Sequence, residues 1–168
     1  MKQVLIILRG APCSGKTTLG KNLRNFEKKI TWLSLDYMKP IFSEFKDETL
    51  EAANEASLNT LNYLFEQEYS VVFDGIFKNP EHLKKAIKIA DNRNIPIVIY
   101  QLECSLKTLL ARDKNRAWVK RGADPLGDGL ITSLYEKVIN NPIKEAIKLN
   151  TEEKSLEECL KIIRKNFD

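Results

Sequence analysis

The hydrophobic and polar positions of this chain follow two different periods along its length. Short, continuous apolar runs predict buried β-strands at residues 4–8, 30–35, 70–73, 95–102 and 146–149. Apolar residues at helical spacing lie between them, at 16–27, 37–45, 48–68, 80–92, 106–114, 131–140 and 156–166. Because the strand runs are apolar throughout rather than at every second residue, we expect an α/β fold whose parallel sheet is covered by helices on both faces.

Length and composition favour one domain that spans residues 1–168. A chain of 168 residues with 43% hydrophobic content can bury one core. No apolar stretch approaches about 18 residues, so we expect a soluble, cytoplasmic protein with no membrane partner. The three cysteines are odd in number and form no C-x-x-C pair, which supports neither a disulfide framework nor a zinc site. The single histidine, His82, opens a lysine-rich amphipathic segment and is expected at the surface.

One motif is chemically specific and follows the first predicted strand directly. Residues 10–17 match the phosphate-binding pattern G-x-x-x-x-G-K-[ST], in which backbone N–H groups surround phosphates at the start of a helix. Within it, Lys16 can reach the terminal phosphates and Thr17 can ligate Mg²⁺. The motif therefore predicts that the chain binds a nucleoside triphosphate. The residues expected to contact it are Gly10, Ala11, Pro12, Cys13, Ser14, Gly15, Lys16, Thr17 and Thr18.

Phosphate loops occur in several protein classes, so the accompanying residues decide between them. A D-x-x-G match at 124–127 follows no predicted strand, and no Asn-Lys-x-Asp motif comes after it, which disfavours a GTPase. The residue after Asp74 is Gly75 rather than a glutamate that would polarise water, which disfavours a mechanical ATPase. The remaining interpretation is a kinase that transfers a phosphoryl group to a hydroxyl.

Two aspartates end predicted strands and therefore belong to the ligand-binding edge of the sheet. Asp36 ends the second strand, where a carboxylate can take the proton of an attacking hydroxyl, although it can also act as a helix cap. Asp74 ends the third strand, where a carboxylate can hold Mg²⁺ directly or through water, although it can also be a turn residue. The sequence leaves open which of the two is the base and which is the metal partner.

A glycine-bearing segment at 115–129 has the composition of a mobile lid. Arg112 precedes this segment, and Arg116 and Arg121 lie within it. The three arginines can bring guanidinium groups to the transferred phosphate, or they can form a solvated basic face. Which of these arginines contacts the phosphate is open. Aromatic residues that can wall an acceptor pocket, or simply belong to the core, are Tyr37, Phe42, Phe45 and Trp118.

The order of these motifs resembles the small P-loop kinases, and is most similar to the group of polynucleotide 5′-hydroxyl kinases, chloramphenicol phosphotransferase-like proteins and zeta-toxin-like kinases. The matching features are the loop at 10–18, Leu-Asp at 35–36, Val-Val-Phe-Asp-Gly at 71–75, Arg-x-x-x-Arg at 112–116 and Lys-Leu-Asn-Thr at 148–151. The resemblance implies a P-loop NTPase three-layer α/β/α sandwich with strand order 2-3-1-4-5. It further implies ATP as the nucleotide, Asp36 as general base, and Asn150 and Thr151 beside the adenine. Relatives often carry an arginine near 81–85, where this chain has lysines.

The sequence thus predicts an ATP-dependent and Mg²⁺-dependent phosphotransferase whose acceptor is a hydroxyl of a small molecule or of a polynucleotide 5′ end. The catalytic residues predicted are Lys16, Asp36, Arg112 and Arg116. The net charge of +4 is too mild to choose between the two acceptor classes, so nucleic acid remains an open partner. The alternative from another class is an ATP-binding regulatory protein without transfer activity. The sequence identifies neither the acceptor nor the oligomeric state.

Overall fold

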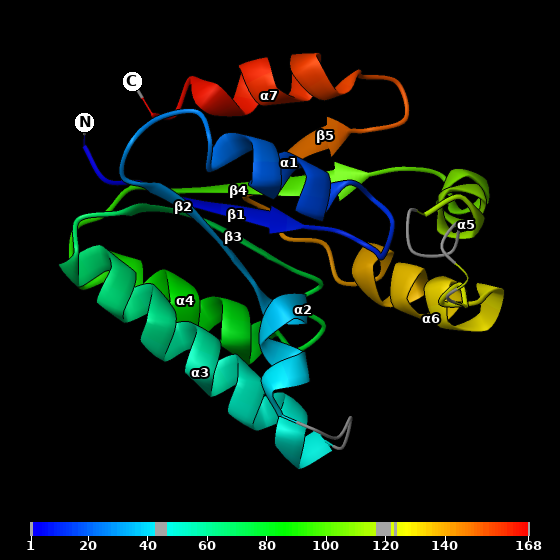
Figure 1. Ribbon diagram of the computed structural model, residues 1–168, viewed down its shortest axis with the longest axis horizontal. Helices are drawn as coiled ribbons and strands as arrows, with labels where there is room; N and C mark the ends of the chain where they lie inside the picture. The colour runs from blue at the N-terminus through cyan, green and yellow to red at the C-terminus, as the bar shows by residue number, and fades with distance from the viewer. Residues whose placement is uncertain (1, 43–46, 117–121, 123, 168) are drawn as a thin grey trace.

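A five-stranded parallel sheet forms the centre of the computed structural model, which describes residues 2–42, 47–116, 122 and 124–167 (Figure 1). The strands are β1 (Leu5–Arg9), β2 (Ile30–Ser34), β3 (Ser70–Gly75), β4 (Ile97–Glu103) and β5 (Ile147–Asn150). Their order in the sheet is β2-β3-β1-β4-β5. This is the order 2-3-1-4-5 implied by the resemblance, which is therefore confirmed along with the α/β class.

Helices cover both faces of the sheet, as the continuous apolar strands predicted. Helices α1 (Lys16–Leu23) and α7 (Leu156–Arg164) lie over one face, and α3 (Asp47–Glu66) and α4 (Pro80–Asp91) lie over the other (Figure 1). Helices α5 (Leu106–Lys114) and α6 (Asp128–Ile139) lie beyond the carboxyl ends of the strands. These ends thus have helices beside them on several sides, where a ligand site can form.

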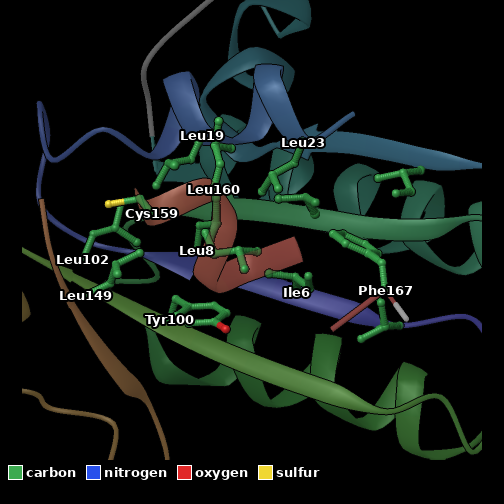
Figure 2. Close-up of a cluster of buried hydrophobic side chains, with 14 residues drawn as sticks. Ile6, Leu8, Leu19, Leu23, Tyr100, Leu102, Leu149, Cys159, Leu160 and Phe167 are labelled. Carbon is green, nitrogen blue, oxygen red and sulfur yellow. The ribbon is translucent and has the colours of Figure 1, made fainter. Parts of the chain in front are cut away.

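Alternate residues of the strands feed two separate hydrophobic cores. On the α1 and α7 face, Ile6 and Leu8 of β1 pack with side chains of the two helices, including Leu19 and Leu160 (Figure 2). On the opposite face, Ile7 and its neighbours pack against α3 and α4. Central strand β1 is buried along its whole length, so the loop that follows it starts from a rigid support.

Most predicted elements are found within a few residues of their expected bounds, but the segment after β2 differs. The second strand stops at Ser34, and a short helix α2 (Leu35–Met38) starts at once, followed by a 3₁₀ turn η1 (Lys39–Ile41). Asp36 therefore lies in the first turn of α2 rather than at the end of the strand. Of the helix predicted at 37–45, residues 37–38 belong to α2 and residues 39–41 form a 3₁₀ turn instead of a continuing α-helix, since Pro40 has no backbone N–H to donate.

Two single positions on the helices complete this description. Ser155 caps α7 and accepts from the Glu158 backbone N–H, while the Glu158 carboxylate accepts from Ser155, so the closing helix begins with a capping box. The surface position predicted for His82 is wrong, since the residue is only 8% exposed. Within the described part of the chain, no helix has the length and apolar character needed to cross a membrane.

Candidate active site

The phosphate-binding loop connects the buried strand β1 to helix α1. Gly15 and Cys13 both have left-handed backbone, with φ of 97° and 66°, which turns the chain sharply into the helix. A Cβ atom at Gly10 would lie 2.5 Å from Ser14 Oγ and 3.1 Å from the carbonyl oxygen of Leu102, so only glycine fits there without displacement. Because the N-cap Gly15 has no side chain to cap the first turn of α1, its N–H groups are available to an anion.

Lys16, the predicted phosphate-binding lysine, is 5% exposed and held inside its own loop. Its ammonium donates to the carbonyl oxygens of Gly10 at 2.9 Å and Ala11 at 2.8 Å. Burial lowers the pKa of Lys16, and the negative charges of Asp74 and Asp36 oppose that effect. The two aspartates that the sequence singled out thus favour the charged form of the lysine.

Asp74 lies on β3 and is fully buried behind the phosphate loop. Its Oδ2 accepts from the indole N–H of Trp32 at 3.2 Å, and burial raises the pKa of the Asp74 carboxyl, although hydrogen bonding and Lys16 act in the opposite direction. Its Oδ1 is buried without a hydrogen-bond partner among the described residues. An oxygen of this kind, together with the Thr17 hydroxyl at the start of α1, suits a hard cation.

Asp74 and Thr17 offer the oxygen atoms that a nucleotide-bound Mg²⁺ needs from the protein. No cluster of three or more His, Cys, Asp or Glu side chains in the described ranges could hold a metal by itself. Mg²⁺ is commonly held by only one or two protein carboxylates together with substrate phosphates and water. Since Asp74 does not line the large cavity described below, a contact through water suits its position better than direct ligation.

Asp36, the predicted base, lies on α2 with a side chain that is 47% exposed. Its Oδ1 pairs with the ammonium of Lys39 at 2.5 Å, one helical turn further on. Partial burial raises the pKa of Asp36, but the charge and hydrogen bond of Lys39, with help from Lys16 and Arg116, outweigh it, so the pKa is lowered overall. Lys39 is absent from the predicted site residues because the predicted helix begins at residue 37. Asp36 then lies outside the helix, and no i,i+3 contact with Lys39 is expected.

A cavity of about 1570 Å³ joins these groups. Its lining includes ten of the predicted site residues: Pro12, Cys13, Gly15, Lys16, Thr17, Thr18, Asp36, Arg112, Arg116 and Thr151. Tyr37 also lines it. Five others lie outside its wall: Gly10, Ala11, Ser14, Asp74 and Asn150. The structure therefore brings the phosphate loop, Asp36 and Arg112 of α5 to one cavity, whose lining does not include Gly10 or Asp74.

Arg112 connects the phosphate loop to the loop after β5. Its guanidinium donates to the carbonyl oxygen of Cys13 at 3.3 Å, to Thr151 Oγ1 at 3.2 Å and to the Thr151 carbonyl oxygen at 2.6 Å. Thr151 in turn donates to the Ser14 carbonyl oxygen at 3.0 Å. Asn150 instead shapes the loop, since its Oδ1 accepts from the N–H groups of the two residues after Thr151. The predicted adenine-side residues and the phosphate loop thus form one connected unit.

The lid region is described only in part. Arg116 lies 3.6 Å from the carboxylate of Asp113, which is itself buried and accepts from the backbone N–H of Gly127. Asp113 therefore joins α5 to the segment that leads into α6, and this role is not among those predicted from the sequence. Arg121 and Trp118 lie outside the described residues, as does Phe45, and their predicted roles stay predictions. The lid itself, at 115–129, stays a prediction for the same reason.

Two more groups at the cavity were missed from the sequence. Glu152 accepts from the Thr108 hydroxyl and from the N–H and hydroxyl of Ser105, and these hydrogen bonds lower its pKa to about 2. His82 of α4 pairs with Glu51 of α3 at 3.0 Å, and both line the cavity. The helical spacing of His82 with Ala86 and Ala90, which are buried, could have placed the histidine on the inner face of α4.

Comparisons with known proteins identify the family of the chain and solved structures of similar fold. A family model described as an AAA domain matches residues 5–125. A candidate kinase from Chloroflexus aurantiacus J-10-fl superposes with a TM-score of 0.73 at 17% identity, over 99% of this chain and 96% of that one. A sugar kinase from Janibacter sp. HTCC2649 gives 0.70 at 13% identity, over 97% and 93%.

A chain of the Pnkp1/Rnl/Hen1 RNA repair complex also superposes, with a TM-score of 0.70 at 16% identity over 92% of this chain and 52% of that one. At such identities these likenesses show the fold alone. They confirm the resemblance to the small P-loop kinases at the level of the fold, because the superpositions extend over 92–99% of this chain.

Proposed function

The chain belongs to the AAA domain family, and we propose that it is an ATP-dependent phosphotransferase acting on a hydroxyl. The observation that carries the proposal is a single cavity lined by both Lys16 of the phosphate loop and Asp36 of α2. One group is suited to the triphosphate and the other to an attacking hydroxyl. The kinases among the structural neighbours support the same reaction class.

In the proposed reaction the acceptor oxygen attacks the γ-phosphorus while the bond to the β–γ bridging oxygen breaks, and ADP leaves. Lys16 exchanges its loop carbonyl partners for phosphate oxygens, and the N–H groups at the start of α1 hold the phosphates in place. Asp36 takes the hydroxyl proton at its carboxylate. Mg²⁺, when bound near Thr17 and Asp74, neutralises charge on the phosphates.

Lys39 has a specific part in this scheme. Because its ammonium contacts Asp36, the carboxylate stays ionised and able to accept a proton, at the expense of some basicity. Arg112 holds the phosphate loop against the loop after β5, so we propose that it positions the nucleotide rather than moving in to reach it. Arg116, which contacts Asp113, stays the candidate for the transferred phosphate.

The acceptor is proposed only as a hydroxyl of a small molecule or of a polynucleotide 5′ end. The neighbours include both a sugar kinase and a chain of an RNA repair complex, so they favour neither class. A steep dependence of the acceptor KM on salt would indicate a polynucleotide, since several phosphates would be contacted.

The direct test is transfer of labelled γ-phosphate from ATP, with Mg²⁺, to a panel of hydroxyl acceptors. We expect Asp36→Asn to keep ATP binding and lose transfer, and Lys16→Ala to slow transfer by several orders of magnitude. Lys84→Ala, on the exposed face of α4 away from the cavity, is the control. Tight ATP binding with no transfer to any acceptor would instead support a regulatory ATP-binding protein, and near-normal turnover in Asp36→Asn would remove that residue from the mechanism.

A further inference from the structure

One polar pair in the wall of the large cavity has no part in the reaction described above. The imidazole Nε2 of His82, on α4, lies 3.0 Å from Glu51 Oε2, on α3. Both residues line the cavity that also contains Asp36 and Lys16. His82 is the only histidine of the chain. The pair therefore has access to whatever molecule stands beside the proposed base.

The sheet order places this pair on the acceptor side of the phosphate loop. Helix α2 follows β2, and α3 and α4 flank β3, whereas Arg112 and Thr151 come from segments that follow β4 and β5. Since β1 and its loop lie between β3 and β4, the two groups approach the phosphates from opposite sides (Figure 1). A molecule in contact with Glu51 and His82 would thus reach Asp36 without crossing the nucleotide position.

A purely structural role would be to bridge two packed helices, and the chain already has such a bridge. Glu55 and Lys85 join α3 to α4 one turn away, in full ion-pair contact, and neither lines the cavity. The Glu51–His82 pair differs because the histidine is almost buried while the glutamate side chain is 55% exposed. An ionised carboxylate only accepts, so Nε2 carries the hydrogen and Glu51 retains a second oxygen for a ligand hydroxyl.

The other side chains at this end indicate the chemistry of the ligand. Lys39 already pairs with the carboxylate of Asp36, and the other charged side chains that line this end are Glu51, Lys21 and Lys78. Asn54 adds an uncharged donor and acceptor, and an apolar strip completes the wall: Leu50, Ile76 and Phe77. A phosphate placed beside the Glu51–His82 pair would face the Glu51 carboxylate. A molecule with several hydroxyls and an apolar face, such as a sugar ring, would find partners for both.

We propose that Glu51 and His82 determine acceptor specificity, and that the acceptor is an uncharged, polyhydroxylated small molecule. The proposal rests on the proposed phosphotransferase function and names the substrate class that this function leaves open. A polynucleotide 5′ end is the competing class, and the experiment below separates the two.

The single histidine makes a direct binding experiment possible. In the presence of Mg²⁺ and a non-hydrolysable ATP analogue, the imidazole Cε1–H signal of His82 is followed by NMR. The probes are neutral hexoses, pentitols and nucleosides, and a hexathymidylate with a free 5′-hydroxyl. We expect a saturable shift with a neutral probe. The affinity should be about 10- to 100-fold weaker in Glu51→Gln, because a hydrogen bond to a charged group is lost. In the matched control Glu55→Gln the affinity should be unchanged.

Stability and turnover measurements keep the two proposals separate. Glu51→Gln and Glu55→Gln should melt alike and bind the ATP analogue alike, and His82→Asn should raise the acceptor KM without changing that of ATP. Binding of a neutral probe without phosphate transfer would leave the subsite standing and overturn the kinase. Three results would overturn the subsite. The first is transfer to an acceptor whose KM is the same in Glu51→Gln and in the unchanged protein. The others are an NMR shift with the oligonucleotide alone and the absence of a shift with every neutral probe.

Discussion

Replacing Trp32 by phenylalanine tests how the buried carboxylate behind the phosphate loop is stabilised. The indole N–H donates to Asp74 Oδ2 at 3.2 Å, while Oδ1 has no partner in the described part of the chain. Phenylalanine keeps an aromatic ring against Tyr37, whose centroid lies 5.1 Å from that of Trp32, but removes the donor. Asp74, which is 1% exposed, then loses this donor, while Ser34 and Lys16 still favour its charged form.

The expected loss of stability follows from the loss of the indole donor to Asp74. Leaving a buried group without its partner costs about 1–3 kcal/mol, and more when the group is charged. The phenyl ring also makes less contact than the indole, so we expect the free energy of unfolding to fall by about 2–3 kcal/mol. For a domain of this size, that loss lowers Tm by about 4–12 °C. Because Trp32 helps to lower the pKa of Asp74, its removal should also raise that pKa further.

The pH dependence has a definite sign. Burial raises the folded-state pKa of Asp74 above the ordinary value of 3.8, so this group favours the folded state most below that value and the benefit is lost as pH rises through the raised pKa. The penalty of Trp32→Phe falls on the charged form. It should therefore be largest at neutral pH and shrink as pH falls toward about 3.8.

Urea denaturation of Trp32→Phe, Asp74→Leu and the double variant measures the effect. In the Asp74→Leu background no carboxylate needs the donor, so the cost of Trp32→Phe should fall by at least about 1 kcal/mol. A cost below about 0.5 kcal/mol, or the same cost in both backgrounds, would refute the assigned hydrogen bond.

Three further predictions concern other contacts. Lys39→Met removes the cation beside Asp36 and should raise its pKa, so the acidic limb of the kcat/KM profile should move to higher pH; an unmoved limb would show that Asp36 is not the titrating base. Gly20→Ala should destabilise by about 1–3 kcal/mol in urea titrations, because the new Cβ would lie 2.3 Å from the Trp32 ring, although helix propensity alone predicts a gain. Ser155→Ala should lower stability by about 0.5–2 kcal/mol in thermal unfolding, and no loss would contradict the capping box.

The nucleotide side of the site was predictable because its signal is contiguous. Residues 10–17 carry the glycines, the lysine and the hydroxyl in one short segment after a strand, and the structure places them as one loop. Asp36 could be singled out for a similar reason, as the polar residue that follows an apolar run. Its partner Lys39 could not, because an i+3 contact needs a helix that already includes residue 36.

The proposed acceptor side was not predictable, since its residues meet only through helix packing. Glu51 and His82 are 31 positions apart and come together because α3 packs against α4. The lysines after His82 suggested a surface residue, yet they occupy the outer face of α4 while His82 shares the inner face with Ala86. A lysine-rich composition describes a whole segment, whereas burial is decided position by position around the helix.

Both charged groups that the proposed reaction uses already have partners within the chain. Lys16 is held by two carbonyl oxygens of its own loop, and Asp36 by Lys39. A triphosphate therefore exchanges neutral partners of a buried ammonium for anionic ones, which favours the charged lysine that burial disfavours. An uncharged acceptor does not displace the charged partner of Asp36, so the carboxylate can keep its contact with the Lys39 ammonium until it takes the hydroxyl proton. The binding energy of the nucleotide is thus expected to come mainly from the loop, and discrimination between acceptors from the opposite wall of the cavity.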